Sequence, residues 1–236
     1  DEVNLDFQVL GPSANSEDSV DVLLAASRKE KVDDRVMVAE LAGLKPVIID
    51  VEPYAARISI DSIISQLPAG GEGLILAVFD IGQTATRLSV VYNGQTIFER
   101  EQPFGGSKLT QEIVRLYGLT VEEAELKKRT GDLPENYTTE LLHPFVEEGA
   151  TELARSLQFF FSSTPYERVD RIFLAGGAAV TPGLAEAVLQ KTSVTTEILS
   201  PFQGMEIGDS ISEKQMNLDA PALLVSCGLA MRRFDQ

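Results

Sequence analysis

The sequence predicts an α/β protein built around a mixed β-sheet. Three apolar runs follow one another between residues 74 and 101, and Asn93-Gly94, the strongest short signal for a β-hairpin, joins the second run to the third. From residue 169 onward, strand and helix patterns alternate. A hydrophobic content of 44% and a mean hydropathy near zero fit a globular chain that is long enough to bury a core.

The first 52 residues predict two strands, a helix and a third strand. Apolar residues alternate with polar ones at the start, which predicts a half-buried strand at Val3, Leu5, Phe7 and Val9. A surface loop is expected at residues 11–19, a strand at 20–27, a helix at 29–44 with Gly43 as its stop, and a strand at 45–51. This segment is too small to form a complete domain by itself.

A helix is predicted at residues 53–67, because Pro53 suits a first helical turn and the glycine-rich residues 68–73 end it. Three consecutive antiparallel strands then follow, at residues 74–79, 86–92 and 95–101.

Helices and two more strands complete the pattern. Helices are expected at 108–117 and 121–129, the second with a capping box of Thr120 and Glu123, and a long helix ends near Ser162. A strand at 169–174, a helix from Thr181-Pro182, a strand at 195–199 and a closing helix at 221–234 follow. This order of elements is that of the ribonuclease-H-like half-domain found in actin, sugar kinases and the large heat-shock chaperones, a mixed sheet with helices on both faces.

The turn after the first of the three strands is the first candidate for chemistry. In this fold nucleotide phosphates meet backbone N–H groups at such turns, which requires small residues. Residues 80–86, Asp-Ile-Gly-Gln-Thr-Ala-Thr, form such a turn, and Asp80 would hold a magnesium ion through water. The alternative is that Asp80 and Gly82 are simply good turn residues.

Two further places could contact a nucleotide. Gly176 and Gly177 follow a strand, where a base or ribose can approach the backbone, although a turn with positive φ would need glycine equally. Glu125 and Lys128 lie three residues apart on one predicted helix and could bind ribose and base, or form only a solvated ion pair.

Composition excludes several other functions. The chain has 36 acidic and 20 basic residues and a formal net charge of -16, so its field disfavours nucleic acid and anionic lipid as partners. One histidine, His143, and one cysteine, Cys227, leave no Cys/His metal site and no intrachain disulfide, and a cytoplasmic location is the simplest expectation. A nucleophilic site would need His143, which precedes Pro144 at a helix start and has no cysteine near it in the sequence. No run approaches the roughly 20 apolar residues that span a bilayer, so we expect no direct membrane insertion.

Several motifs in order resemble the PilM family, cytoplasmic actin-like proteins of type IV pilus assembly that are similar in fold to the cell-division protein FtsA. These motifs are FDIGQTATRLSV, EQPFGGSKLTQEI, AELKKRTGDLP, VDRIFLAGGAAVTPGLAEAV and LDAPALLVSCGLAMRRFD. The resemblance implies that residues 1–52 are the latter part of an inserted subdomain, that 53–73 belong to the first actin-like half, and that 74–236 form the second half with a helical insert at about 107–140.

The resemblance also implies residue roles. The second phosphate loop would be Asp80, Gly82, Gln83 and Thr84; the glycine pair before the next helix, Gly105 and Gly106; the ribose and base contacts, Glu125 and Lys128; and the adenosine loop, Gly176 and Gly177. ATP and magnesium are expected in the full-length protein. The first half with its phosphate loop lies outside these 236 residues, so we expect them to bind ATP weakly or not at all.

The implied role is a scaffold, at most a weak ATPase, located at the inner membrane through its partners. The implied partners are the cytoplasmic tail of PilN, which requires the missing N-terminal part, a PilZ-type adaptor and the pilus motor ATPases. The alternatives are a superfamily kinase acting on a small substrate, for which the sequence offers no catalytic base other than Asp80, and an FtsA-like filament-forming protein.

Overall fold

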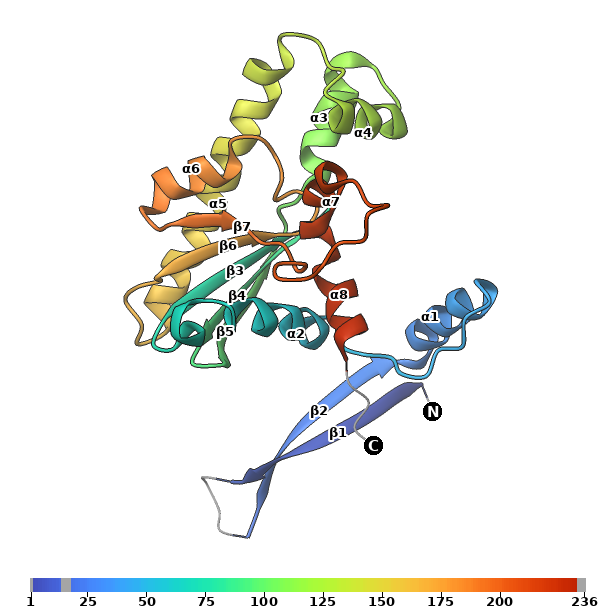
Figure 1. Ribbon diagram of the computed structural model, residues 1–236, viewed down its shortest axis with the longest axis vertical. Helices are drawn as coiled ribbons and strands as arrows, with labels where there is room; N and C mark the ends of the chain where they lie inside the picture. The colour runs from blue at the N-terminus through green and yellow to red at the C-terminus, as the bar shows by residue number, and fades with distance from the viewer. Residues whose placement is uncertain (1, 14–17, 233–236) are drawn as a thin grey trace. The chain divides into compact units, whose positions relative to one another are not determined.

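The computed structural model describes residues 2–13 and 18–232 of the chain (Figure 1). The chain divides into two compact units, Asp1–Tyr54 and Ala55–Gln236.

The first unit contains a two-stranded antiparallel sheet and one helix. Its elements are β1 (Val3–Pro12), β2 (Val20–Arg28) and α1 (Lys29–Leu41). Phe7 pairs with Leu24 and Val9 with Val22, so the apolar residues of both strands share one face of this sheet.

That apolar face is exposed, so the predicted strand is confirmed but its predicted half-burial is wrong. Phe7 is 68% exposed and Leu24 is 63% exposed. The physical reason is that a sheet of two strands buries little by itself, and no second layer within the described residues of this unit covers this face.

Two further expectations for this unit need correction. Residues 45–51 form no strand, because the sheet of this unit contains only β1 and β2 and gives this segment no hydrogen-bonding partner. The predicted loop at residues 11–19 begins too early, since Gly11 and Pro12 belong to β1, and residues 14–17 of it lie outside the described part.

The second unit is built on a five-stranded mixed sheet with the order β5-β4-β3-β6-β7. The antiparallel strands are β3 (Ile75–Ile81), β4 (Thr86–Tyr92) and β5 (Gln95–Gln102), and the hairpin turn at Asn93-Gly94 has positive φ at both residues. Strands β6 (Arg171–Ala175) and β7 (Thr196–Ile198) run parallel to β3. The predicted mixed sheet is therefore confirmed.

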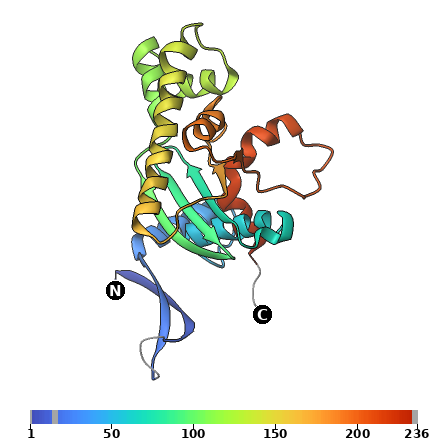
Figure 2. The same ribbon diagram turned by 90° about the vertical axis from the view of Figure 1, so that its left-hand side faces the viewer.

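Helices cover both faces of this sheet (Figure 2). On one face, Phe79 and Ile81 of β3 pack with residues of α3 (Ser107–Tyr117), α5 (His143–Ser163) and α6 (Leu184–Thr192). On the other face, Leu76 and Val78 pack with α2 (Glu52–Ile64) and α8 (Leu224–Met231). Because both faces of β3 are buried, its sequence is almost continuously apolar, and Asp80 stands out at its end.

The remaining elements refine the predictions. They are η1 (Pro68–Gly71), α4 (Val121–Thr130), the π-helical turn η2 (Thr138–Leu142), α7 (Glu213–Asp219) and η3 (Ala220–Leu223). The capping box of Thr120 and Glu123 is confirmed at the start of α4. The sequence reading missed α7, which Ser212 caps, and residues 233 and 234 of the predicted closing helix lie outside the described part.

The crossing of α2 and α8 leaves no space for a side chain at Gly228. A methyl group there would overlap the Ala55 carbonyl oxygen, and the Ser59 hydroxyl donates a hydrogen bond of 2.7 Å to the Leu224 carbonyl beside it. Helix α8 therefore lies directly against the backbone of α2.

We expect Gly228→Ala to lower the free energy of unfolding by about 3 kcal/mol, because the two helix backbones must separate to admit the methyl group. Urea denaturation measures this change. Gly208→Ala is the matched control, since a methyl group there meets nothing within 4 Å, and it should leave stability nearly unchanged. Equal stability of the two variants would contradict the packing described.

Candidate functional site

The turn between β3 and β4 contains two backbone amides with no backbone acceptor among the described residues. The Gly82 amide donates to the Ala85 carbonyl at 2.9 Å and closes the turn. Gln83 and Thr84 at its tip are exposed, and within the described residues neither amide has a protein acceptor. Two adjacent unpaired N–H groups are suited to binding an anion.

The segment before α3 holds this turn in place. The Gly106 amide donates to the Gly82 carbonyl at 3.0 Å, and the Ser107 amide donates to the Gln83 carbonyl at 2.8 Å. A methyl group at Gly105 would lie 2.5 Å from the Gln83 carbonyl oxygen, so this approach requires glycine. The turn is thus fixed to the N-terminus of α3.

The loop after β6 approaches the same strand end. Gly176 has φ of +87°, and a methyl group on it would overlap the Ile81 carbonyl oxygen and lie 2.5 Å from Asp80 Oδ1. The Asp80 carboxylate therefore lies against the Gly176 backbone. Gly177 is exposed, and only the Ala222 methyl group, at 3.8 Å, would contact a side chain added there.

The structure thus brings three predicted segments together at the end of β3: the turn at 82–85, residues 105–106 and residues 176–177. Their glycines differ in what they do. Gly105 and Gly176 lie so close to neighbouring backbone that a side chain would not fit. For Gly176, the alternative that a turn with positive φ requires glycine therefore holds. Gln83, Thr84 and Gly177 are the exposed members that a ligand could reach.

Glu125 and Lys128 of α4 lie together, as predicted, and also contact Thr110 of α3. Lys128 Nζ donates to Glu125 Oε1 at 2.8 Å and to the Thr110 hydroxyl oxygen at 2.7 Å, and the Thr110 hydroxyl donates to Glu125 Oε1. The Lys128 side chain is 21% exposed and that of Glu125 is 39% exposed, so the pair is partly buried rather than fully solvated.

Sequence reasoning missed Thr110, although it is buried and joins α3 to α4. It lies one helical turn after Gly106, whose carbonyl oxygen is 3.3 Å from the Thr110 hydroxyl and also accepts from the Thr110 amide. That spacing was the available signal. Through Thr110 the Glu125–Lys128 pair is connected to the segment that fixes the turn.

Burial raises the pKa of Glu125, but hydrogen bonds from Lys128 and Thr110 and the charges of Lys128 and Arg129 outweigh it and hold the pKa below the ordinary value of 4.5. Arg129 also pairs with Asp219 of α7 at 3.1 Å. The carboxylate of Glu125 is therefore stabilised in its charged form.

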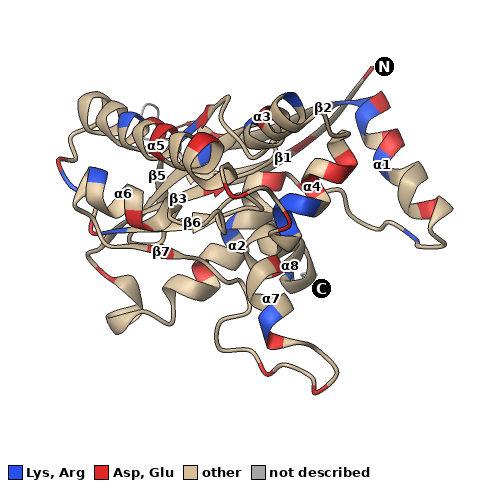
Figure 3. Ribbon diagram, turned by 90° about the horizontal axis from the view of Figure 1, so that it is seen from above, with Lys and Arg blue, Asp and Glu red and all other residues tan. Residues whose placement is uncertain are grey.

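The site could hold a metal ion only with help from a ligand. No group of three or more His, Cys, Asp or Glu side chains is placed to bind a metal ion in the described part of the chain. Asp80 would therefore need phosphate oxygens and water to complete a magnesium shell, which is how this ion is commonly held beside nucleotides. Figure 3 shows acidic and basic residues interspersed along α4, α5 and α7.

We expect Glu125→Gln to lower the free energy of unfolding at pH 7 by about 1 kcal/mol, the scale of a partly screened charged hydrogen bond. A carboxyl with a lowered pKa stabilises the fold above its unfolded value of 4.5 and loses this contribution as the pH falls through the lowered pKa. The difference between variant and wild type should therefore shrink below pH 4.5 in urea denaturation. Exposed Glu206→Gln is the control, and a difference that does not change with pH would contradict this account.

Comparison with solved structures supports an actin-like fold. The chain is 28% identical, with a TM-score of 0.78, to a chain of a structure described as the PilM-PilN type IV pilus biogenesis complex; the match covers 98% of this chain and 66% of that one. It is 19% identical to the ethanolamine utilization protein EutJ from Carboxydothermus hydrogenoformans, with a TM-score of 0.60, over 87% of this chain and 62% of that one. It is 16% identical to MreB5 of Spiroplasma citri bound to AMPPNP, with a TM-score of 0.54, over 87% of this chain and 64% of that one.

The chain therefore spans less than two-thirds of the length of these structures. The described helices include none with the length and apolar character needed to cross a membrane. A family model described as type IV pilus assembly protein PilM matches residues 1–234, nearly the whole sequence. The resemblance expected from the motifs is confirmed, and the chain belongs to the PilM family of type IV pilus assembly proteins.

Proposed function

We propose that these residues form one wall of an ATP site in a PilM-type scaffold of the type IV pilus assembly machine. The observation that carries the nucleotide part is the convergence of three glycine-bearing segments on the end of β3 beside Asp80. The family match supports the pilus assembly part.

Each residue of the site has a role in this proposal. The amides of Gln83 and Thr84 bind phosphate oxygens, and Asp80 binds magnesium through water. Gly105 and Gly106 hold the turn to α3. The neighbour MreB5 was solved with AMPPNP, so a nucleotide is compatible with this fold.

The adenosine part lies toward α4 and the loop after β6. Gly176 shapes that loop, and exposed Gly177 leaves room for the ligand. Glu125 and Lys128 bind ribose and base, sharing hydrogen bonds that they now make with each other and with Thr110.

The proposed partners follow from the family. The similar structure is a complex of PilM with PilN, which supports the PilN tail as a partner of the full-length protein. A PilZ-type adaptor and a pilus motor ATPase are proposed on the cytoplasmic side, so that the scaffold stays at the inner membrane through its partners. ATP would favour one arrangement of the two actin-like halves and change partner affinity through that preference.

The test uses the full-length protein that contains these residues. We expect it to bind ATP with magnesium in calorimetry and to bind an immobilised PilN tail with an affinity that ATP changes. Asp80→Asn should weaken ATP binding about tenfold, because one charge next to the metal is lost, and the effect of ATP on PilN binding should then require about tenfold more ATP.

Asp209→Asn makes the same chemical change at an exposed loop position and serves as the control. Unchanged ATP affinity in Asp80→Asn would refute the nucleotide site. A full-length protein that does not bind the PilN tail would refute the scaffold role, so the two parts fail separately.

A further inference from the structure

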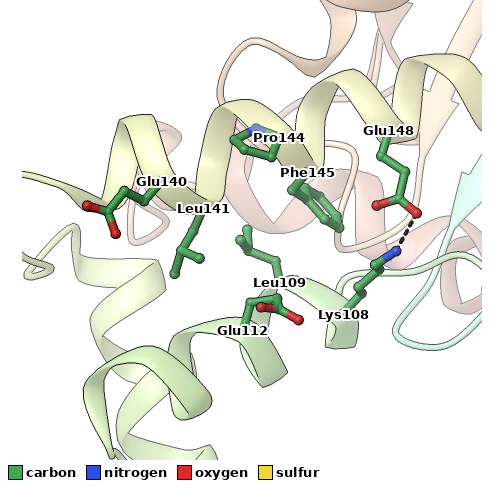
Figure 4. A pocket seen from close by; sticks show the side chains of 8 residues that line it. All are labelled: Lys108, Leu109, Glu112, Glu140, Leu141, Pro144, Phe145 and Glu148. Carbon is green, nitrogen blue, oxygen red and sulfur yellow. Dashed lines mark hydrogen bonds and ion pairs between the residues drawn. The ribbon is translucent and has the colours of Figure 1, made fainter.

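A groove separates α3 from the helical segment formed by η2 and α5 (Figure 4). Its lining combines apolar and charged side chains from three elements: Lys108, Leu109 and Glu112 of α3; Glu140 and Leu141 of η2; and Pro144, Phe145 and Glu148 of α5. It uses none of the residues assigned to the nucleotide site.

The floor of the groove is apolar and firmly packed. Leu109, Leu141 and Phe145 converge between the two helices in Figure 4. Leu109 and Phe145 belong to the main core, and the Phe145 ring stacks on Phe104 with a centroid distance of 5.2 Å. A side chain that entered the groove would therefore meet a rigid apolar surface.

The rim of the groove is acidic. Three glutamates and one lysine line it; Lys108 forms an ion pair with Glu148 and Arg115 forms one with Glu112, so among the described residues of the rim the uncompensated negative charge is that of Glu140. Glu140 lies at the opposite end of the groove from Glu148 and makes no salt bridge within the described residues. The pKa of Tyr117 on α3 is raised, mainly by burial and in addition by the negative charge of Glu140.

The size of the groove favours a protein segment over a small molecule. Its volume is about 210 Å³, below the roughly 300–1,000 Å³ of typical small-molecule pockets. An open groove of this size accepts one or two side chains of a segment that continues past both ends. The acidic rim complements a positively charged segment.

We propose that this groove is a docking site for a segment of another protein that places an apolar side chain against Leu141 and the accessible edges of Leu109 and Phe145, and a basic side chain beside Glu140. Amphipathic segments commonly bind grooves between helices in this way, with apolar anchors setting affinity and rim charges setting specificity. The basic character of the partner follows from the groove itself and does not depend on the nucleotide.

The test selects binders from a displayed library of short random peptides, using the 236-residue chain as bait. We expect the selected peptides to be enriched in Lys or Arg next to Leu, Ile, Met or aromatic residues. Their affinity, measured by fluorescence anisotropy, should fall about tenfold in Glu140→Lys, because the reversed charge repels the basic side chain.

Glu147→Lys is the matched control: it makes the same charge change at an exposed position of α5 that does not line the groove. Leu141→Ser, which shortens the apolar floor, should weaken the same peptides, and circular dichroism confirms that each variant is folded. Selected peptides without basic enrichment would overturn the proposal. An equal loss of affinity in Glu140→Lys and Glu147→Lys would also overturn it, because it would show attraction to the overall negative charge alone.

Discussion

Close approach of backbone to backbone at the end of β3 is the constraint on which the candidate site depends. Gly105 lies against the Gln83 carbonyl and Gly176 against the Ile81 carbonyl, at separations that leave no space for a β-carbon. Hydrogen bonds from Gly106 and Ser107 then fix the carbonyls of the turn, with Gln83 and Thr84 at its exposed tip. A turn held in this way is ordered before any ligand arrives, which lowers the entropy cost of binding.

Helix α3 connects the candidate nucleotide site with the groove between α3 and α5. Its N-terminal residues hold the turn, and Thr110 contacts Glu125 and Lys128 of α4. Leu109 and Glu112 of the same helix line the acidic groove. A displacement of α3 on ligand binding would also move the residues of α3 that line the groove, because a packed helix moves largely as a unit.

Sequence patterns predicted the second unit better than the first, for physical reasons. The strand β3 is buried on both faces and the turn at Asn93-Gly94 needs positive φ, so local chemistry and tertiary structure agree there. Residues 45–51 look like a strand because they are apolar, but a strand needs a hydrogen-bonding partner, which periodicity does not report. Likewise, alternation in β1 identified which face is apolar without showing whether anything covers it.

The sequence indicated which residues form the candidate site, but not which of them pack against backbone and which a ligand can reach. Order along the chain brought Asp80, Gly82 and Gly176 to one strand end, whereas only the structure separates glycines that admit backbone from residues that a ligand can reach. The signal for Thr110 was its place one helical turn after Gly106, which is too common for a threonine inside a helix to single out a site residue.

The proposed contact between the amides of Gln83 and Thr84 and the phosphates of a nucleotide can be tested by amide hydrogen exchange. The measurement follows the turn at residues 82–85 in the full-length protein. Exchange at the two amides is expected to slow with ATP and magnesium and to stay unchanged with adenosine, which has no phosphates. Equal exchange with and without ATP, under conditions where calorimetry shows ATP bound, would contradict it.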